Sequence, residues 1–306
     1  MVGLALTLSA CGGQDDSTNA DGGISGEVVV DGSSTVQPLT AAAGELFGEE
    51  QQKVNVSVAT SGTGGGFEKF CQGQTDISNA SRPIADDEIA MCEEKGVKYT
   101  ELQVATDALT VVVSKENDFI TCLTTEELAT LWAPDAEGKI TEWNQVNPEF
   151  PAETIDLYGP GTDSGTFDYF TDEINGEEGA SRSDYNASED DNTTVQGVSG
   201  SANALGYFGF SYYEENADKL KAVEIDSGDG CVAPSAEAAQ DGTYTPLARP
   251  LFIYVSDAAV KKKPQVAAFI DFYAANDGDI AEAAQFIPLN EEQVSELKSA
   301  ADQLVS

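Results

Sequence analysis

The chain has 306 residues, with 54 acidic and 15 basic side chains and no histidine, so its formal net charge at neutral pH is −39. This acidic balance argues against nucleic acids and anionic membrane surfaces as partners, because both would be repelled. Hydrophobic residues make up 41% of the chain and charged residues 23%, which excludes global disorder and allows one large domain or two of ordinary size.

The N-terminus is apolar and leads to the sequence LSAC at residues 8–11, with small residues directly before a cysteine. This looks like the lipobox of a bacterial lipoprotein. The apolar run is too short to span a bilayer and lacks a positive n-region, so we interpret residues 1–11 as a truncated lipoprotein signal, with Cys11 as the acylated residue. Residues 12–25 are polar and glycine-rich, which predicts a flexible tether. The alternative is a chance apolar start with a buried cysteine.

Strands and helices are predicted to alternate through the first third of the chain. Glu27–Val30 reads as a strand, and Pro38 opens an amphipathic helix. Residues 53–62 and 75–84 predict two more strands, each followed by a helix, and residues 97–114 predict two strands in succession. This order predicts an α/β fold with a mostly parallel sheet.

The remaining two thirds of the chain continue in the same style. A helix over residues 124–134 has Thr124 or Thr125 as its cap, and residues 154–174 are again strand, turn and helix. The polar segment 176–200 is expected to be a surface excursion. Further strands are predicted within residues 203–216, 220–225 and 246–256, and closing helices at 263–276 and 291–305.

Besides Cys11, the chain has four cysteines, and an even number in an exported chain suggests two disulfides. Four cysteines allow three pairings. We favour Cys71–Cys92, which are close in sequence, and this leaves Cys122–Cys231. A zinc site would need all four thiolates and lacks the usual C-x-x-C pairs, so no metal is expected.

Three strand-to-helix turns share one composition: DGSSTVQP (31–38), TSGTGGGF (60–67) and GTDSGTF (161–167). Each offers hydroxyls and free backbone N–H groups at a helix start, where partial positive charge binds oxyanions. In open α/β sheets, ligands lie beyond the carboxyl ends of strands, where these turns are placed. The three turns therefore predict one shared anion site.

Catalytic uses of these turns fit poorly. GTGGGFEK does not match the P-loop pattern. A hydrolase acting on phosphate or acyl esters through Ser164 or Ser61 is the alternative of a different class. Its nucleophile would need a base, normally histidine, which the chain lacks; a pair with Lys69 is the one substitute near these turns. No enzymatic activity is expected.

The segments DGSSTVQPLT, SGTGGGFEKFCQGQTDISNASRPI and GPGTDSGTF together resemble the phosphate-binding proteins of bacterial ABC-type phosphate uptake, the PstS family. The nearest likeness is to its cyanobacterial-type branch, sometimes called SphX, and it extends over residues 26–306 through SRSDYNASEDDN, ALGYFGFSYYEEN and FIPL. The resemblance implies a two-lobed periplasmic-binding-protein fold of type II that closes on one phosphate ion without a cofactor.

The implied organisation has lobe 1 at residues 26–105 plus 250–306 and lobe 2 at 106–249, with the chain crossing near ATDAL and PLARP. The expected protein is a monomer in the periplasm or at the cell surface, held to the membrane only by its lipid anchor. Its partners would be inorganic phosphate and an ABC-type phosphate permease, and not nucleic acid.

Carried over by motif, the resemblance implies phosphate contacts from the three turns: Ser34, Thr35, Val36 (through its N–H), Ser61, Thr63, Ser164, Gly165 and Thr166. A guanidinium fork matches an oxyanion bidentately, so Arg82 and Arg182 are candidate ligands as well, with a surface salt bridge the alternative for Arg82. Arg249 precedes the last strand and is expected to be structural, at the lobe crossing.

The sequence departs from the family pattern at two places. Arg82 stands where many members have an aspartate that accepts the proton of hydrogen phosphate, and Pro160 stands where many have an arginine. Asp163 or Asp31 could supply the acceptor instead. Two alternatives to phosphate uptake therefore stay open: another tetrahedral oxyanion such as sulfate or molybdate, or a sensor or surface adhesin without transport.

Overall fold

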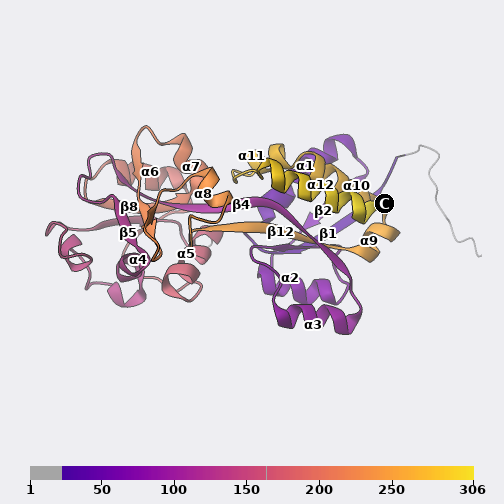
Figure 1. The fold of residues 1–306 in the computed structure, drawn as a ribbon, viewed down its shortest axis with the longest axis horizontal. Helices are drawn as coiled ribbons and strands as arrows, with labels where there is room; N and C mark the ends of the chain where they lie inside the picture. The colour runs from indigo at the N-terminus through magenta and orange to yellow at the C-terminus, as the bar shows by residue number, and fades with distance from the viewer. Residues whose placement is uncertain (1–22, 163) are drawn as a thin grey trace, which may run out of the picture.

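The computed structural model describes residues 23–306 except residue 163. The predicted lipoprotein signal with Cys11 and most of the predicted tether lie outside the described residues, as does Asp163. No helix within the described part of the chain is both long enough and apolar enough to cross a membrane. Figure 1 shows two lobes side by side, joined by two long strands, β4 (Tyr99–Ser114) and β12 (Ala248–Ser256).

Lobe 1, on the right in Figure 1, contains the beginning and the end of the described chain. Its helices α1, α10, α11 and α12 cover one face of the sheet, and α2 and α3 cover the other. Its elements are β1 (Gly26–Gly32), α1 (Gln37–Glu50), β2 (Val54–Val58), α2 (Gly62–Cys71), β3 (Ile77–Ala80), α3 (Asp86–Lys95), α9 (Asp257–Lys262), α10 (Pro264–Ala275), α11 (Asp277–Ala283) and α12 (Glu291–Val305).

Lobe 2 contains the middle of the chain. Its elements are β5 (Cys122–Thr124), α4 (Thr125–Trp132), two short 3-10 turns (Pro134–Ala136 and Trp143–Gln145), β6 (Asp156–Gly159), α5 (Gly165–Asn175), β7 (Asn186–Ala187), α6 (Asp191–Ser199), β8 (Ala204–Gly209), α7 (Phe210–Glu215), β9 (Leu220–Ala222), β10 (Glu224–Asp226), β11 (Cys231–Val232) and α8 (Ala236–Gln240). Thr124 caps α4 by accepting from the Glu127 N–H, which decides between the two predicted caps.

One sheet runs through both lobes in the order β2-β1-β3-β12-β4-β8-β6-β7, with β9 on β4. β1 pairs in parallel with β2 and β3, and β6 pairs in parallel with β7 and β8. The crossing strands are antiparallel to each other, with Arg249 opposite Asp107. The carboxyl ends of β1 and β3 and the start of α5 therefore meet where the lobes face each other.

Two predicted boundaries are wrong. Residues 97–114 form one strand rather than two, because the polar residues at the crossing keep backbone partners: Thr106 pairs with Ile287, and Asp107 pairs with Arg249. Residues 220–225 form two strands rather than one, since β9 joins the large sheet and β10 joins a separate sheet with β5 and β11.

The segment 176–200 is also more than a surface excursion, since it supplies β7 and α6. Val195 and Val198 of α6 are buried against β8 and β9, in a cluster with Phe208 and Leu220. Apolar residues spaced three apart in this polar segment are what fix α6 to the sheet.

Two large apolar clusters and two disulfides hold the lobes. One cluster packs β1, α1, α10, α11 and α12, and the other packs β4, α4, α5 and β8 around Trp132 and Trp143, both fully buried. The disulfides Cys71–Cys92 and Cys122–Cys231 are those that the sequence predicts.

Candidate functional site

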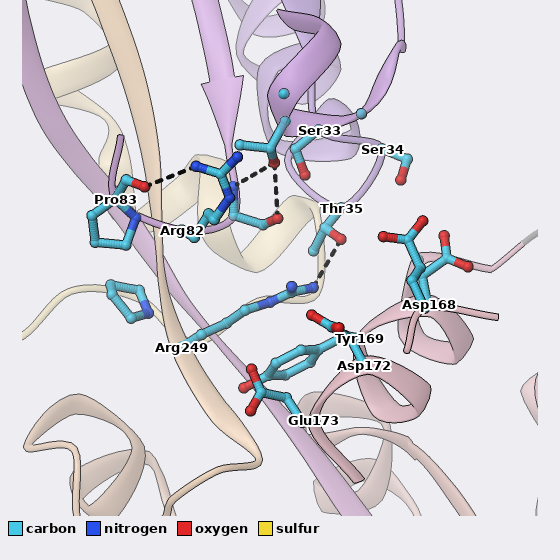
Figure 2. Close-up of a pocket in the computed structure, with 17 residues that line it drawn as sticks. Ser33, Ser34, Thr35, Arg82, Pro83, Asp168, Tyr169, Asp172, Glu173 and Arg249 are labelled. Atoms are coloured by element: carbon cyan, nitrogen blue, oxygen red, sulfur yellow. Dashed lines mark hydrogen bonds between the residues drawn. The ribbon is translucent and has the colours of Figure 1, made fainter. Parts of the chain in front are cut away.

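A cleft of about 490 Å³ lies between the lobes, and Figure 2 shows its residues. Lobe 1 contributes the turns after its strands β1, β2 and β3, at residues 33–35, 62–64 and 81–83. Lobe 2 contributes α5, and the crossing strand β12 contributes its first residues. Lining residues are Ser33, Ser34, Thr35, Gly62, Thr63, Gly64, Ser81, Arg82, Pro83, Gly165, Asp168, Tyr169, Asp172, Glu173, Glu178, Arg249 and Pro250. Five predicted site residues thus share one cavity: Ser34, Thr35, Thr63, Arg82 and Gly165.

The first turn, after β1, brings lobe 1 into contact with lobe 2. Gly32 has a positive φ of 139°, and a Cβ there would lie 2.2 Å from the carbonyl oxygen of Asn79, so only glycine fits. A Cβ on Gly165 would lie 2.9 Å from the Thr35 hydroxyl oxygen. The first turn and the N-terminus of α5 therefore approach to side-chain contact across the cleft. Val36 is fully buried, and its side chain does not line the cleft.

The second turn, after β2, is held by hydrogen bonds to its neighbours. Ser61 donates its hydroxyl to Asp31 at 2.7 Å and is not among the lining residues. The Thr63 and Ser81 hydroxyl oxygens lie 3.1 Å apart, and Thr63 also accepts from the Ser81 N–H at 3.3 Å. Thr63 is thus the residue of this turn that presents a hydroxyl at the cleft wall.

Asp31, one of the two candidate proton acceptors, is engaged beneath these turns. Burial raises its pKa, but hydrogen bonds from Lys69 and Ser61 outweigh burial, and the net effect is a lowered pKa. It also accepts from the Gly32 N–H at 2.8 Å and does not line the cleft. Asp31 is therefore an ionised carboxylate that orders the two turns.

The third turn places the positive end of α5 at the cleft. Ser164 is the N-cap and accepts from the Thr166 N–H at 3.2 Å. Gly165 lines the cleft, whereas Thr166 lines a smaller cavity of about 140 Å³ on the other side of the crossing strands, beside Asp107. The N–H groups of a first helical turn have no intrahelical partners and carry partial positive charge, so this end of α5 favours an anion in the cleft.

The three arginines are placed differently from one another. Arg82 lines the cleft, with its side chain 45% exposed, and it donates to both carboxylate oxygens of Glu88 at 2.8 Å. Arg182 is 5% exposed within lobe 2, donates to the carbonyls of Leu131 and Ile140 and pairs with Asp184, and is not among the lining residues.

Arg249, which the sequence predicted to be structural and at the lobe crossing, lies at the crossing and also lines the cleft. Its Nη2 donates to the Thr35 hydroxyl at 2.9 Å, and its Nε lies 3.3 Å from Asp107. Its guanidinium carbon lies 3.6 Å from the centre of the Tyr169 ring. Figure 2 shows the two side chains next to each other. Burial raises the pKa of Asp107, and the Arg249 charge opposes that rise. Arg249 thus touches lobe 1, lobe 2 and both crossing strands.

The lobe 2 wall of the cleft is acidic, which the sequence reasoning also missed. Asp168, Asp172 and Glu173 lie on α5 and face Thr35 and Arg249 in Figure 2; Glu178 follows the helix. Burial is the main cause that raises the pKa of Asp168, and the nearby Glu178 raises it further. The spacing was a usable signal, because Asp168, Asp172 and Glu173 are three, seven and eight positions after Gly165 and so share its helix face.

Two lobes, two antiparallel crossing strands and a polar cleft at helix N-termini define a solute-binding protein. A family model described as a PBP superfamily domain matches residues 17–277. The chain is 48% identical to protein SphX of Synechocystis sp., covering 95% of this chain and 84% of the relative. It is 41% identical to the phosphate-binding protein PstS of Staphylococcus saprophyticus, covering 99% and 92%.

A solved structure of a possible phosphate binding protein from Planctomyces limnophilus has a TM-score of 0.87 and 44% identity, covering 92% of this chain and 100% of that one. The chain belongs to the PBP superfamily and, within it, to the family of the PstS and SphX proteins. It is accordingly a binding protein and not an enzyme, and the fold is the type II periplasmic-binding-protein fold that the resemblance implied.

Proposed function

We propose that this protein is a lipid-anchored, extracytoplasmic binding protein that captures one inorganic phosphate ion in the cleft and delivers it to an ABC-type phosphate permease. The observation that carries the proposal is the convergence of Arg249, the Thr35 hydroxyl and the N-terminus of α5 on one cavity between the lobes. The names of the relatives, protein SphX and phosphate-binding protein PstS, support the choice of ligand.

The donors in the cleft suit an oxyanion. Thr35, Ser34 and Thr63 offer hydroxyls, and the first turn of α5 offers N–H groups. Charge-assisted hydrogen bonds contribute about 1.5–3 kcal/mol each, so about four to six of them reach the roughly −8 kcal/mol of a micromolar complex after ordering costs.

We assign the chief guanidinium contact to Arg249 rather than to Arg82 or Arg182. Asp107 and Tyr169 hold the Arg249 side chain in the middle of the cleft, so little rotamer freedom is lost when it binds an anion. Arg82 is a second contact at the rim, where Glu88 occupies one side of its fork. Arg182 is a structural residue of lobe 2, because its donors are used by backbone carbonyls and Asp184.

Asp168 is the proposed acceptor that distinguishes phosphate from sulfate. At neutral pH phosphate carries at least one O–H donor, whereas sulfate carries none, so a carboxylate in the site favours phosphate and repels sulfate. Asp168 lies on the first turn of α5, three residues after Gly165, and lines the cleft opposite Arg249. In this proposal Asp168 takes the role of the aspartate that many family members have at the position of Arg82.

The test is calorimetric titration of residues 12–306 with phosphate at moderate salt, followed by sulfate as competitor. Micromolar or tighter phosphate binding that excess sulfate does not displace is the expected result. Equal binding of sulfate would retain the oxyanion site and overturn phosphate specificity. No binding of either ion would overturn the proposal and favour a sensor or adhesin.

A further inference from the structure

A second cavity, of about 460 Å³, lies at the end of lobe 1 that is farthest from the cleft. Its wall comes from residues 73–76 before β3, residues 96–98 before β4, and residues 256–263 around α9. The starts of β3 and β4 and the end of β12 lie side by side at one end of these strands, and the cleft lies at the other end. Figure 1 places α9 at the outer end of this lobe. We call this cavity the basal pocket.

The basal pocket is basic in a chain that is otherwise strongly acidic. Lysines and arginines number 15 in the whole chain, yet four lysines line this pocket against two carboxylates: Lys98, Lys261, Lys262 and Lys263 against Asp76 and Asp257. The cleft, by contrast, has two arginines against four carboxylates.

Three of the four basal lysines form no ion pair within the part of the chain that the structure describes. Lys263 pairs with Asp76 at 2.8 Å. Lys98, Lys261 and Lys262 are exposed and form no ion pair with any residue that the structure describes. With 54 acidic residues in the chain, three neighbouring lysines without a carboxylate partner are available to an external anion.

A buried hydroxyl in the same wall also lacks a partner. Thr75 is 8% exposed, and its Oγ1 has no hydrogen-bond partner among the described residues. Because this oxygen is itself buried, the charge of the lysines is what the pocket offers to an external anion.

The pocket lies beside the point where the N-terminal segment enters the fold. The Gly26 N–H donates to the Lys53 carbonyl at 3.2 Å, and Gln265 donates to the Glu27 carbonyl at 3.2 Å, two residues after Lys263. Cys11 precedes Gly26 by fifteen residues, which can span at most about 50 Å. A lipid anchor on Cys11 would therefore keep this end of lobe 1 close to the membrane surface.

We propose that the basal pocket binds the phosphate-bearing headgroup of an anionic membrane phospholipid. The inference rests on the lipid anchoring proposed above, which brings the pocket to the bilayer. The net charge of −39 opposes such contact at long range. Screening over about 8 Å at physiological ionic strength leaves the local lysines to determine the contact once the anchor has brought them close.

The experiment replaces the anchor by an N-terminal histidine tag on residues 12–306, which holds the protein on vesicles that contain a small fraction of nickel-chelating lipid. The vesicles are otherwise phosphatidylglycerol-containing or pure phosphatidylcholine, and flotation at physiological ionic strength measures how much protein stays bound as imidazole is raised. The test variant combines Lys98→Gln, Lys261→Gln and Lys262→Gln. The control variant combines Lys115→Gln, Lys139→Gln and Lys298→Gln, which are exposed lysines elsewhere. Both variants change the net charge equally, so the comparison isolates the place of the charges.

The expected result is tighter retention on the anionic vesicles than on phosphatidylcholine, with this difference reduced about tenfold or more by the basal variant and little by the control variant. No tighter retention on the anionic vesicles, or equal loss in both variants, would overturn the proposal. Calorimetric titration of the same proteins with phosphate tests the other source of the ligand. A second phosphate site that only the basal variant loses, without tighter retention on anionic vesicles, would assign the pocket to free phosphate and overturn the lipid proposal. Cleft binding in the same titration tests the proposed function separately.

Discussion

The substitution Arg249→Lys tests the proposed role of the guanidinium in the middle of the cleft. Arg249 donates to Thr35, lies 3.3 Å from Asp107 and stacks on Tyr169. Lysine keeps the positive charge beside Asp107, so the fold should be retained. It lacks the planar fork, however, and cannot meet Thr35, Asp107 and an anion from one ammonium group.

The expected cost follows from the contacts that are lost. One charge-assisted hydrogen bond to the anion is worth about 1.5–3 kcal/mol, which corresponds to a dissociation constant raised about tenfold to 150-fold. The stacking of the guanidinium on Tyr169 is already present without a ligand, so its loss should lower the stability of the variant rather than its affinity.

The assay is calorimetric titration with phosphate, with a thermal melt of each variant to confirm folding. Arg82→Lys is the matched control, because Arg82 lines the same cleft but is 45% exposed and tied to Glu88. We expect this variant to raise the dissociation constant less than about tenfold. If both variants fold and Arg82→Lys weakens binding as much as Arg249→Lys does, the assignment of the chief contact to Arg249 is wrong.

Three further changes have defined outcomes. Asp168→Asn should narrow the preference for phosphate over sulfate about tenfold or more in competition titrations, and an unchanged ratio would remove Asp168 as the acceptor. Gly165→Ala places a Cβ 2.9 Å from the Thr35 hydroxyl and should weaken phosphate binding about tenfold. The control is Gly48→Ala, where a Cβ meets nothing within 4 Å, and it should leave the affinity unchanged. Equal affinities of the two variants would argue against a role in phosphate binding for the close approach of Gly165 to Thr35. Burial, with Asp190 and Glu189 nearby, raises the pKa of Asp191 to about 6. The stability that the protonated Asp191 contributes is present below pH 4 and is lost as the pH rises through 6. Asp191→Asn should therefore raise the free energy of unfolding at pH 7.5 by about 1–2 kcal/mol, seen as a higher melting temperature, and should leave it unchanged at pH 4.

Elements with local signals were predictable from the sequence. The helix expected over residues 291–305 is α12 (Glu291–Val305), because its apolar spacing and the capping box at Asn290 lie within the segment itself. The meeting of the three predicted turns at one cavity was also predictable, since their hydroxyls and glycines adjoin the helix starts at the carboxyl ends of strands. The place of the crossing was implied by the family resemblance, but the continuity of β4 through it was not predictable, because β4 continues by pairing with β12, more than a hundred residues later.

The side chains of the site depended on this non-local pairing. Arg249 reaches the cleft because β12 sets it opposite Asp107, which no local pattern in PLARP indicates. Arg182 shows the converse: SRSDY resembles a family motif, but nearby carbonyls and Asp184 hold the guanidinium inside lobe 2. An aspartate two residues after an arginine was the one local hint of such an internal pair.

The charge distribution explains how so acidic a chain can bind an anion. Each arginine of the cleft has a carboxylate beside it, Glu88 for Arg82 and Asp107 for Arg249, and carboxylates outnumber arginines in the cleft lining, so the cleft has no excess of positive charge. Affinity must then come from donors that point at one place: the Thr35 hydroxyl, the α5 N–H groups and one fixed guanidinium. Such donors act over a few ångströms. Most of the net charge of −39 lies farther from the ion, and salt screens its effect over that longer distance. They also recognise the shape and protonation of the ion, and this is why a carboxylate such as Asp168 can stand in an anion site and favour the protonated ligand.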